Sequence, residues 1–209
     1  MIENIKWLGH GSFAIQGTPS IYIDPWRIVR EAFYPDIILI SHEHYDHCSI
    51  ADIQKLRGAE TIILGNEKVA EKIDGISIIR PWQSMTFDRV SIKAIPAYAP
   101  DGIHHKESDG GLGFVISMNY YDIYYAGDTK LIPEMSRISP DIVILPIDNR
   151  DTLTIQEAVE VVDLLSPRWV IPSNWGSIGE GASIVDANEF KKQVGGRATV
   201  IIPDSKNPI

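Results

Sequence analysis

A short segment of the chain, "HEHYDH" at residues 42–47, brings together side chains that are well suited to bind a metal. Neutral imidazole and carboxylate are ligands for zinc, iron and manganese. Side chains at alternate positions of extended backbone point the same way, so His42, His44 and Asp46 can converge on one volume. His47 reaches the same region if the chain turns there. We therefore expect a metal site here, with a solvated polar turn as the alternative.

The other residues of this segment fit supporting positions. Glu43 and Tyr45 alternate with the histidines, so we expect them at the surface or behind the ligands. Cys48 is the single cysteine of the chain, and one thiol does not make a sulfur-rich structural site. We expect Cys48 to be a small buried residue.

The neighbouring elements place the segment at the end of a strand. The apolar run "DIILIS", residues 36–41, predicts a buried strand that ends where the histidines begin. Ser49, followed three residues later by Asp52, is typical of a capped helix start, and the apolar spacing after it predicts a helix of about two turns.

Strands and helices alternate through the rest of the chain. Upstream, "IENIKWL", "SFAIQ" and "SIYID" predict a β meander. Downstream, strands are expected at "ETIIL", "ISII", "VSIKAI", "GFVISM", "DIYYA", "DIVILP", "RWVIP" and "ATVII", and helices at "NEKVAEKI" and at residues 131–137, 155–165 and 185–194. Two β-rich halves, each with helices, predict an α/β fold, a four-layer α/β/β/α sandwich. Because no linker divides the halves, we expect a single domain over residues 1–209.

Regular structure is interrupted between Pro96 and Gly113, where Pro, Gly, Asp and His predominate. A long loop of this kind is more typical of function than of packing. It contains His104 and His105, which are further candidate ligands.

The charge balance limits the expected partners. With 19 basic and 28 acidic residues the net charge is −9, which disfavours nucleic acid and anionic lipid, although a local basic pocket can still bind a small anion. The single cysteine, the lack of a signal-peptide pattern and the lack of an apolar run of about 18 residues predict a cytoplasmic protein without a membrane span. We expect a small-molecule substrate, and a homo-oligomer stays open.

Several motifs together resemble the metallo-β-lactamase superfamily. Residues 42–47 match its His-x-His-x-Asp-His motif, and "WLGHGSF" followed by "YIDPW" is similar to the opening hairpin of the branch that includes ascorbate-6-phosphate lactonase-like proteins and many metal-dependent hydrolases. "YYAGDT" resembles that branch's strand-end aspartate motif, and "PSNWG" stands where it usually has a histidine-bearing "PxHxG". The resemblance covers nearly the whole chain and implies the metallo-β-lactamase-like fold, with its site along one edge.

The resemblance implies a first metal position held by three histidines. Two of them are His42 and His44, and the third comes from the long loop. His104 fits best, because it stands before "x-Lys" in a segment similar to the family's His-Pro-Lys loop. His105 is the alternative.

The resemblance also implies a second metal position. Asp46, His47 and Asn174 would hold this metal, and Asp128 would bridge the two positions. Asn174 replaces the family's usual last histidine, and a neutral amide oxygen is a weaker ligand for zinc than imidazole. The expected cofactor is therefore one or two divalent ions, zinc first, with manganese and iron as alternatives.

Three further residues are candidates for supporting roles. Asp24 matches the superfamily's early aspartate, which commonly supports the metal motif from behind, and a plain turn residue before a proline is the alternative. His10 would approach the site from the first hairpin turn or act as a turn residue. Arg150 would recognise a carboxylate or phosphate, or form a surface salt bridge.

The expected reaction is metal-assisted hydrolysis of an ester, lactone or phosphoester of a small molecule by a metal-activated water. Asp46 would orient the water or accept its proton, and His10 or His105 would assist the leaving group or the substrate. One alternative is a non-catalytic metal- or ligand-binding protein that keeps the fold with a weakened second site. A nuclease is a further alternative, which the net charge and the lack of room for a large inserted domain disfavour.

Overall fold

Two β-sheets lie face to face in the computed structural model, which describes residues 1–29, 34–177 and 179–204. The first sheet has the order β1-β2-β3-β4-β5-β6 and the second the order β13-β12-β11-β10-β9-β8-β7. The strands of the first sheet are β1 (Ile5–Gly9), β2 (Ser12–Ile15), β3 (Ile21–Ile23), β4 (Ile37–Leu39), β5 (Ile62–Gly65) and β6 (Ser77–Ile78). Those of the second are β7 (Ser84–Phe87), β8 (Val90–Pro96), β9 (Leu112–Met118), β10 (Tyr121–Tyr125), β11 (Ile142–Pro146), β12 (Trp169–Ser173) and β13 (Thr199–Val200).

The two sheets share one pattern of pairing. Each begins with an antiparallel meander, β1 to β3 and β7 to β10, and continues with parallel strands, β3 to β6 and β10 to β13. The meander expected at the start of the chain is confirmed. Because the carboxyl ends of parallel strands meet at one edge of a sheet, loops from distant parts of the sequence meet there.

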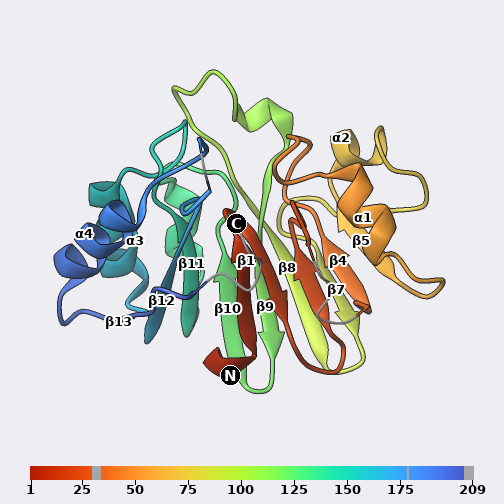
Figure 1. The fold of residues 1–209 in the computed structure, drawn as a ribbon, viewed down its shortest axis with the longest axis horizontal. Coiled ribbons are helices and arrows are strands. Elements are labelled where there is room, and N and C mark those ends of the chain that lie inside the picture. Colours follow the sequence, from red (N-terminus) through yellow and green to blue (C-terminus); the bar gives the residue numbers. More distant parts are fainter. Residues whose placement is uncertain (30–33, 178, 205–209) are drawn as a thin grey trace.

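Helices cover the outer faces of both sheets and complete the four layers (Figure 1). The helices are α1 (Ile50–Leu56), α2 (Glu67–Ala70), α3 (Ile155–Leu165) and α4 (Ile184–Val194), with 3₁₀ turns η1 (Ile2–Asn4), η2 (Glu107–Asp109) and η3 (Pro133–Arg137). In Figure 1, α1 and α2 lie beside the first sheet, and α3 and α4 lie on the opposite side of the molecule. The expected sandwich is therefore confirmed.

Local sequence explains where these helices begin. The Ser49 hydroxyl accepts from the Asp52 amide at the start of α1, and the Asn66 side chain accepts from the Val69 amide at the start of α2. Both caps satisfy amide groups that the first turn of a helix leaves free. The two later helices each begin with a capping box, at Thr154 and at Ser183.

The strands of the first sheet contribute to two apolar layers. Ile21 and Ile23 face the core between the sheets, whereas Tyr22 faces the smaller cluster beneath α1 and α2. This alternation follows from the two-residue period of a strand. The core thereby fixes which strand-end side chains face the shared edge.

One expectation about an element was wrong, and one strand was missed. Residues 131–137 form a 3₁₀ turn that begins only at Pro133, in place of a longer helix. Strand β7 was not predicted, because its side chains are half-buried or exposed and lack a strong apolar pattern. Within the described ranges, no helix is long and apolar enough to cross a membrane.

Candidate metal centre

The candidate side chains meet at the ends of strands. His42 follows β4, Asp128 follows β10, and Asn174 comes directly after β12. His10 comes directly after β1, in the turn that leads into β2. Residues far apart in the sequence are thus brought to one edge of the sandwich.

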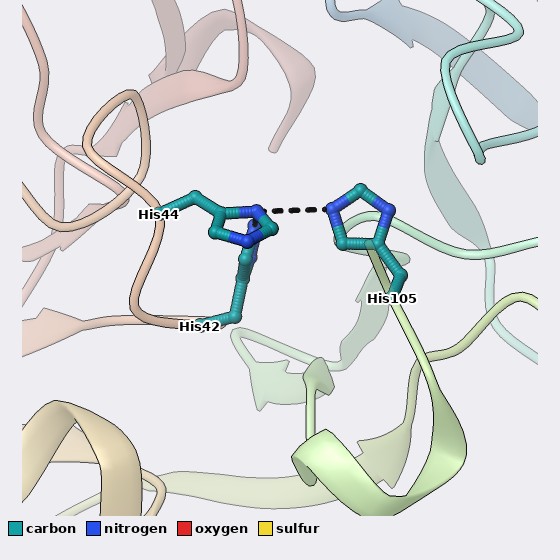
Figure 2. A group of neighbouring side chains, drawn as sticks. All are labelled: His42, His44 and His105. Atoms are coloured by element: carbon teal, nitrogen blue, oxygen red, sulfur yellow. Dashed lines mark hydrogen bonds between the residues drawn. The ribbon is translucent and has the colours of Figure 1, made fainter. Parts of the chain in front are cut away.

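One group of donor atoms comes from three histidines and one aspartate. The His44 Nδ1 atom lies 3.1 Å from His42 Nε2 and 3.2 Å from His105 Nε2. Figure 2 shows these three rings pointing toward one another, two from the segment after β4 and one from the long loop. Asp128 Oδ2 lies 3.4 Å from His105 Nε2 and 3.9 Å from His42 Nε2. We call these four residues the first group.

A second group of donor atoms lies beside the first and shares Asp128. The Asp46 Oδ2 atom is 3.2 Å from His10 Nε2 and 3.9 Å from His47 Nε2. His47 Nε2 lies 3.4 Å from Asp128 Oδ1. Asp128 therefore directs one carboxylate oxygen toward each group. We call His10, Asp46, His47 and Asp128 the second group.

The spacing within both groups suits a small divalent cation. Ligand atoms about 2.0–2.1 Å from a tetrahedral zinc ion lie about 3.3–3.5 Å apart, by simple trigonometry. The distances between donor atoms, from 3.1 to 3.9 Å, surround that value. The side chains are therefore already gathered at the separation that coordination requires.

Hydrogen bonds behind the rings decide which ring nitrogen faces the groups. His47 Nδ1 lies 2.7 Å from Asp24 Oδ2, and His42 Nδ1 lies 2.9 Å from the Ser41 hydroxyl. His105 Nδ1 lies 3.3 Å from the Asp151 carbonyl oxygen. When Nδ1 donates to such an acceptor, Nε2 keeps its lone pair for a metal.

The buried ring nitrogen of His47 tests this fit. His47 is fully buried, and among the described residues its Nε2 atom has no hydrogen-bond partner. A buried polar atom without a partner is costly unless a ligand satisfies it. The residues present therefore fit a divalent metal.

Asp24 anchors the structure behind both groups. It is fully buried and accepts from the Ser41 amide at 2.7 Å, the Ser41 hydroxyl at 2.5 Å and the Tyr125 hydroxyl at 2.7 Å, in addition to His47. This favours a supporting role over a plain turn residue. Sequence reasoning missed Ser41 and Tyr125. Their only signals were a hydroxyl directly before the histidine segment and a tyrosine within "YYAGDT".

The electrostatic environment differs between the two groups. Burial, followed by the neighbouring His47, lowers the pKa of His42 well below its ordinary value, and burial followed by His105 lowers the pKa of His44. Burial also acts to lower the pKa of His47, but Asp128 and Asp24 outweigh it, and this pKa is raised well above its ordinary value. The second group thus attracts positive charge more strongly in the metal-free protein.

The two aspartates of the groups stay ionised. Burial acts to raise the pKa of Asp128, but His47 outweighs it and holds the pKa well below the usual range. Burial also acts to raise the pKa of Asp46, but the hydrogen bond from His10 and the nearby His47 together outweigh burial, and this pKa is lowered. Asp148, after β11, behaves differently: burial and the nearby Asp128 raise its pKa to about 6.

The loop ligand corrects one expectation. The structure places His105, not His104, in the first group. The Asp151 carboxylate accepts from the backbone amides of Ile103 and His104 at 2.8 and 2.9 Å, and the His104 side chain is exposed. Because Asp151 holds the backbone of Ile103 and His104, the ring that reaches His44 is that of His105.

Asn174 lies at the centre but does not present a ligand atom to Asp128. Its Nδ2 atom donates to Asp128 Oδ1 at 2.8 Å. An ionised carboxylate can only accept, so the amide must turn its nitrogen toward it, and an amide nitrogen has no lone pair for a metal. This orientation argues against the expected ligand role of Asn174.

The other residues of the histidine segment point away from the centre. The Tyr45 hydroxyl donates to Glu180 at 2.7 Å, and Glu43 pairs with Lys68 at 3.2 Å. Cys48 is buried, and its burial raises the thiol pKa to about 11. These positions agree with the expectations from the sequence.

A cavity of about 720 Å³ lies behind the turn that carries His10, and no side chain of either group lines it. Its wall includes Trp7 and Trp175, which stack with ring centroids 4.2 Å apart, and the Trp7 indole donates to the His10 carbonyl at 2.9 Å. Arg150 also lines this cavity and lies 3.5 Å from Glu180, as the surface salt-bridge alternative predicts. The cavity therefore combines an apolar wall with a half-exposed cation.

Comparison with known proteins agrees with this geometry. The model of the β-lactamase superfamily domain matches residues 4–174. Metal-dependent hydrolases of the UPF0173 group from Pyrococcus abyssi and Thermococcus onnurineus are 32% and 34% identical, and each alignment covers 95% of this chain and 95% of the relative. The solved structure of a candidate metal-dependent hydrolase from Parabacteroides distasonis has a TM-score of 0.83 and 27% identity, and the match covers 97% of this chain and 93% of that one.

Proposed function

Because the chain belongs to the β-lactamase superfamily and its relatives are metal-dependent hydrolases, we propose that it hydrolyses an ester, lactone or phosphoester of a small molecule at a centre formed by the first and second groups. Use of a divalent metal follows from the family and from the gathered donor atoms. Zinc is the metal that we propose, because both groups combine imidazole with carboxylate at tetrahedral spacing. Manganese and iron accept the same ligands and are the alternatives.

One observation supports this proposal above all. Two sets of donor atoms share the carboxylate of Asp128, and each set contains a buried histidine, His42 or His47, whose ring is held by a hydrogen bond on the side away from the centre. A divalent ion bound there would polarise a carbonyl or phosphoryl oxygen and lower the pKa of a water molecule. A solvated polar turn does not require such backing.

The side chains of the centre have distinct tasks. Asp46 keeps its charge, because its pKa is lowered, and it is the most exposed carboxylate of the two groups. It is therefore placed to accept a hydrogen bond from the attacking water and to orient that water. The histidines of the first group hold their rings in place through the Ser41 hydroxyl and the Asp151 carbonyl.

The cavity behind the His10 turn, which Trp7, Trp175 and Gly181 line, suits the rest of a small substrate. Its volume of about 720 Å³ lies within the range of small-molecule sites, about 300–1,000 Å³. Trp175 offers a flat apolar wall, and Arg150 is 58% exposed at its side chain and can pair with a carboxylate or phosphate. Arg150 already pairs with Glu180, and Asp186 and Asp204 also line the cavity, so a small ester or lactone with an apolar part that packs on the tryptophan wall suits it best.

Turnover measured together with metal content tests the proposal. Protein purified without chelator is assayed on a panel of lactones, phosphodiesters and thioesters, before and after removal and return of zinc. We expect hydrolysis of at least one class, loss with chelator and recovery with metal. Bound metal without turnover on any class would contradict the proposal and favour the non-catalytic alternative. Selective cleavage of polynucleotides would favour the nuclease alternative.

A further inference from the structure

We propose that His10 takes the place of the missing last histidine as a ligand of the second metal position, and that Asn174 instead holds Asp128. This inference rests on the proposed function only in requiring the centre to bind metal. It differs from the expectation that Asn174 ligates the metal and that His10 assists the reaction.

The turn after β1 directs the His10 ring into the centre. His10 has a φ of 51° and stands between Gly9 and Gly11. Its carbonyl oxygen accepts from the Trp7 indole at 2.9 Å and from the backbone N–H of Asn174 at 3.1 Å. This left-handed backbone is costly for a residue with a side chain, and two hydrogen bonds hold it. The His10 ring is 2% exposed.

The donor atoms of His10, Asp46 and His47 all lie within 4.8 Å of one another. His10 Nε2 and His47 Nε2 lie 3.2 and 3.9 Å from the same oxygen of Asp46, and Asp128 directs its Oδ1 to the same side. His47 Nε2 is fully buried and has no hydrogen-bond partner among the described residues. A cation among the donor atoms of His10, Asp46 and His47 would satisfy His47 Nε2, with Asp128 Oδ1 close to that nitrogen and no contribution from residue 174.

Asn174 has a different task that its geometry already fulfils. Its side-chain nitrogen donates to Asp128 Oδ1. Its side-chain oxygen faces Gly11, and a Cβ atom added to Gly11 would lie 3.2 Å from that oxygen. A hydrogen bond to a metal-binding carboxylate fixes the orientation of that carboxylate. Asn174 is thus a positioning residue, because it acts through Asp128.

Glycines close the structure tightly around the His10 ring. A Cβ atom on Gly181 would lie 3.2 Å from His10 Cε1 and only 2.3 Å from the Asn174 carbonyl oxygen. A Cβ atom on Gly11 would lie 2.9 Å from His47 Cε1. The ring therefore has little room to turn away from Asp46, which favours a fixed ligand over a mobile proton carrier.

His10 differs from three of the four other ring ligands in one respect. Its Nδ1 atom is buried and has no hydrogen-bond partner among the described residues, whereas His42, His47 and His105 each have an acceptor behind the ring. An acceptor at that position strengthens a histidine ligand. We therefore expect the second metal to be bound more weakly than the first.

The competing explanation is that His10 only donates a hydrogen bond to Asp46. Two substitutions separate the explanations. His10→Ala removes both the ligand and the donor, whereas His10→Gln keeps an N–H donor for Asp46 but supplies no ring nitrogen. The double variant His10→Ala/Asn174→His returns an imidazole from the opposite side of the centre, and histidine tolerates the left-handed φ of 58° at that position.

Equilibrium binding of cobalt(II) and zinc to these variants tests the inference. We expect two ions for the wild type, and one tight ion for both His10→Ala and His10→Gln. Their second dissociation constant should rise by more than about 100-fold, the upper limit for loss of a supporting hydrogen bond. The retained first ion shows that the variants fold. The double variant should regain the second ion, and the cobalt spectrum should again report two sites.

Several results would overturn the inference. One is a second ion that His10→Gln binds within about 100-fold of the wild type, since loss of a supporting contact costs about 10–100-fold. Another is Asn174→Leu that loses the second ion as completely as His10→Gln, because Asn174 would then be the ligand. Wild-type protein that takes up one ion would remove the second position but leave the proposed function intact. Protein that takes up none would contradict the proposed function itself.

Discussion

The two groups of the centre share Asp128 but differ in how their other ligands are supported. In the first group, hydrogen bonds back the rings of His42 and His105. In the second group, Asp24 backs the ring of His47, whereas no acceptor within the described residues backs His10. The comparison shows that a full set of donor atoms does not by itself make two equal sites, because the strength of a ligand depends on the contacts behind it.

The first group should control activity most strongly. Either His44→Ala or His105→Ala should reduce kcat/KM by at least about 1,000-fold, because several kcal/mol of metal stabilisation are lost and each 1.36 kcal/mol is a factor of ten. Activity and metal content measured on the same samples check this.

His104→Ala is the matched control for His105→Ala. It removes a neighbouring ring from the same loop, but this ring is exposed and lies in neither group. We expect kcat/KM to stay within about twofold of the wild type, as for a surface change away from the site. Equal losses in both variants would contradict the assignment of the loop ligand.

Asp24 should affect both groups, whereas His10 affects one. Asp24→Ala leaves the Ser41, His47 and Tyr125 donors without their buried acceptor. We expect a loss of about 3–5 kcal/mol in the free energy of unfolding of the metal-free protein. In addition, the affinity for both ions should fall about 10–100-fold. Denaturant unfolding and metal titration measure the two effects. A fall in affinity for the second ion alone would contradict the inference that Asp24 supports His42 through Ser41.

Acid should release the second metal before the first. The pKa of His47 is raised above its ordinary 6.5, so protons compete for this ring already above that pH. The pKa values of His42 and His44 are lowered, so these rings stay neutral and able to bind metal as the pH falls below 6.5. Zinc release followed with a chromophoric chelator should show two steps. Release of both ions in one step would contradict the comparison.

The smallest expected effect is on the free energy of unfolding, and it comes from Asp148, which is buried close to Asp128. The pKa of Asp148 is raised to about 6 from 3.8, so its ionised form destabilises the folded metal-free protein. This cost is absent below about pH 3.8, grows as the pH rises, and is complete above about pH 6. Asp148→Asn should therefore stabilise the metal-free protein by about 1–3 kcal/mol at pH 8 and leave it unchanged at pH 4. Equal stability of the variant and the wild type at pH 8 would show that burial and Asp128 together do not disfavour the ionised form of Asp148.

The sequence predicted the fold, and it predicted that His42, His44, Asp46 and His47 gather at one place, because both depend on local patterns. The apolar run before residue 42 indicated a buried strand, and alternation along the chain indicated that His42 and His44 face one volume. The supporting place of Asp24 was visible through the resemblance. These features need only nearby residues or a known motif.

The remaining details depend on contacts between distant residues. The choice between His104 and His105 is made by Asp151, which anchors the loop backbone 47 residues further along the chain. The orientation of the Asn174 amide is decided by Asp128, and the direction of the His10 ring by a turn that Trp7 and Asn174 hold. Neither a propensity nor a spacing rule contains these contacts.

The most direct test of a shared two-position centre is the number of ions bound as zinc is titrated into metal-free wild-type protein. Calorimetry at neutral pH should show two binding events per chain, the first tighter than the second, because His10 lacks a backing acceptor. Two events of equal affinity would contradict the difference between the groups. Absence of any binding would contradict the metal centre as a whole.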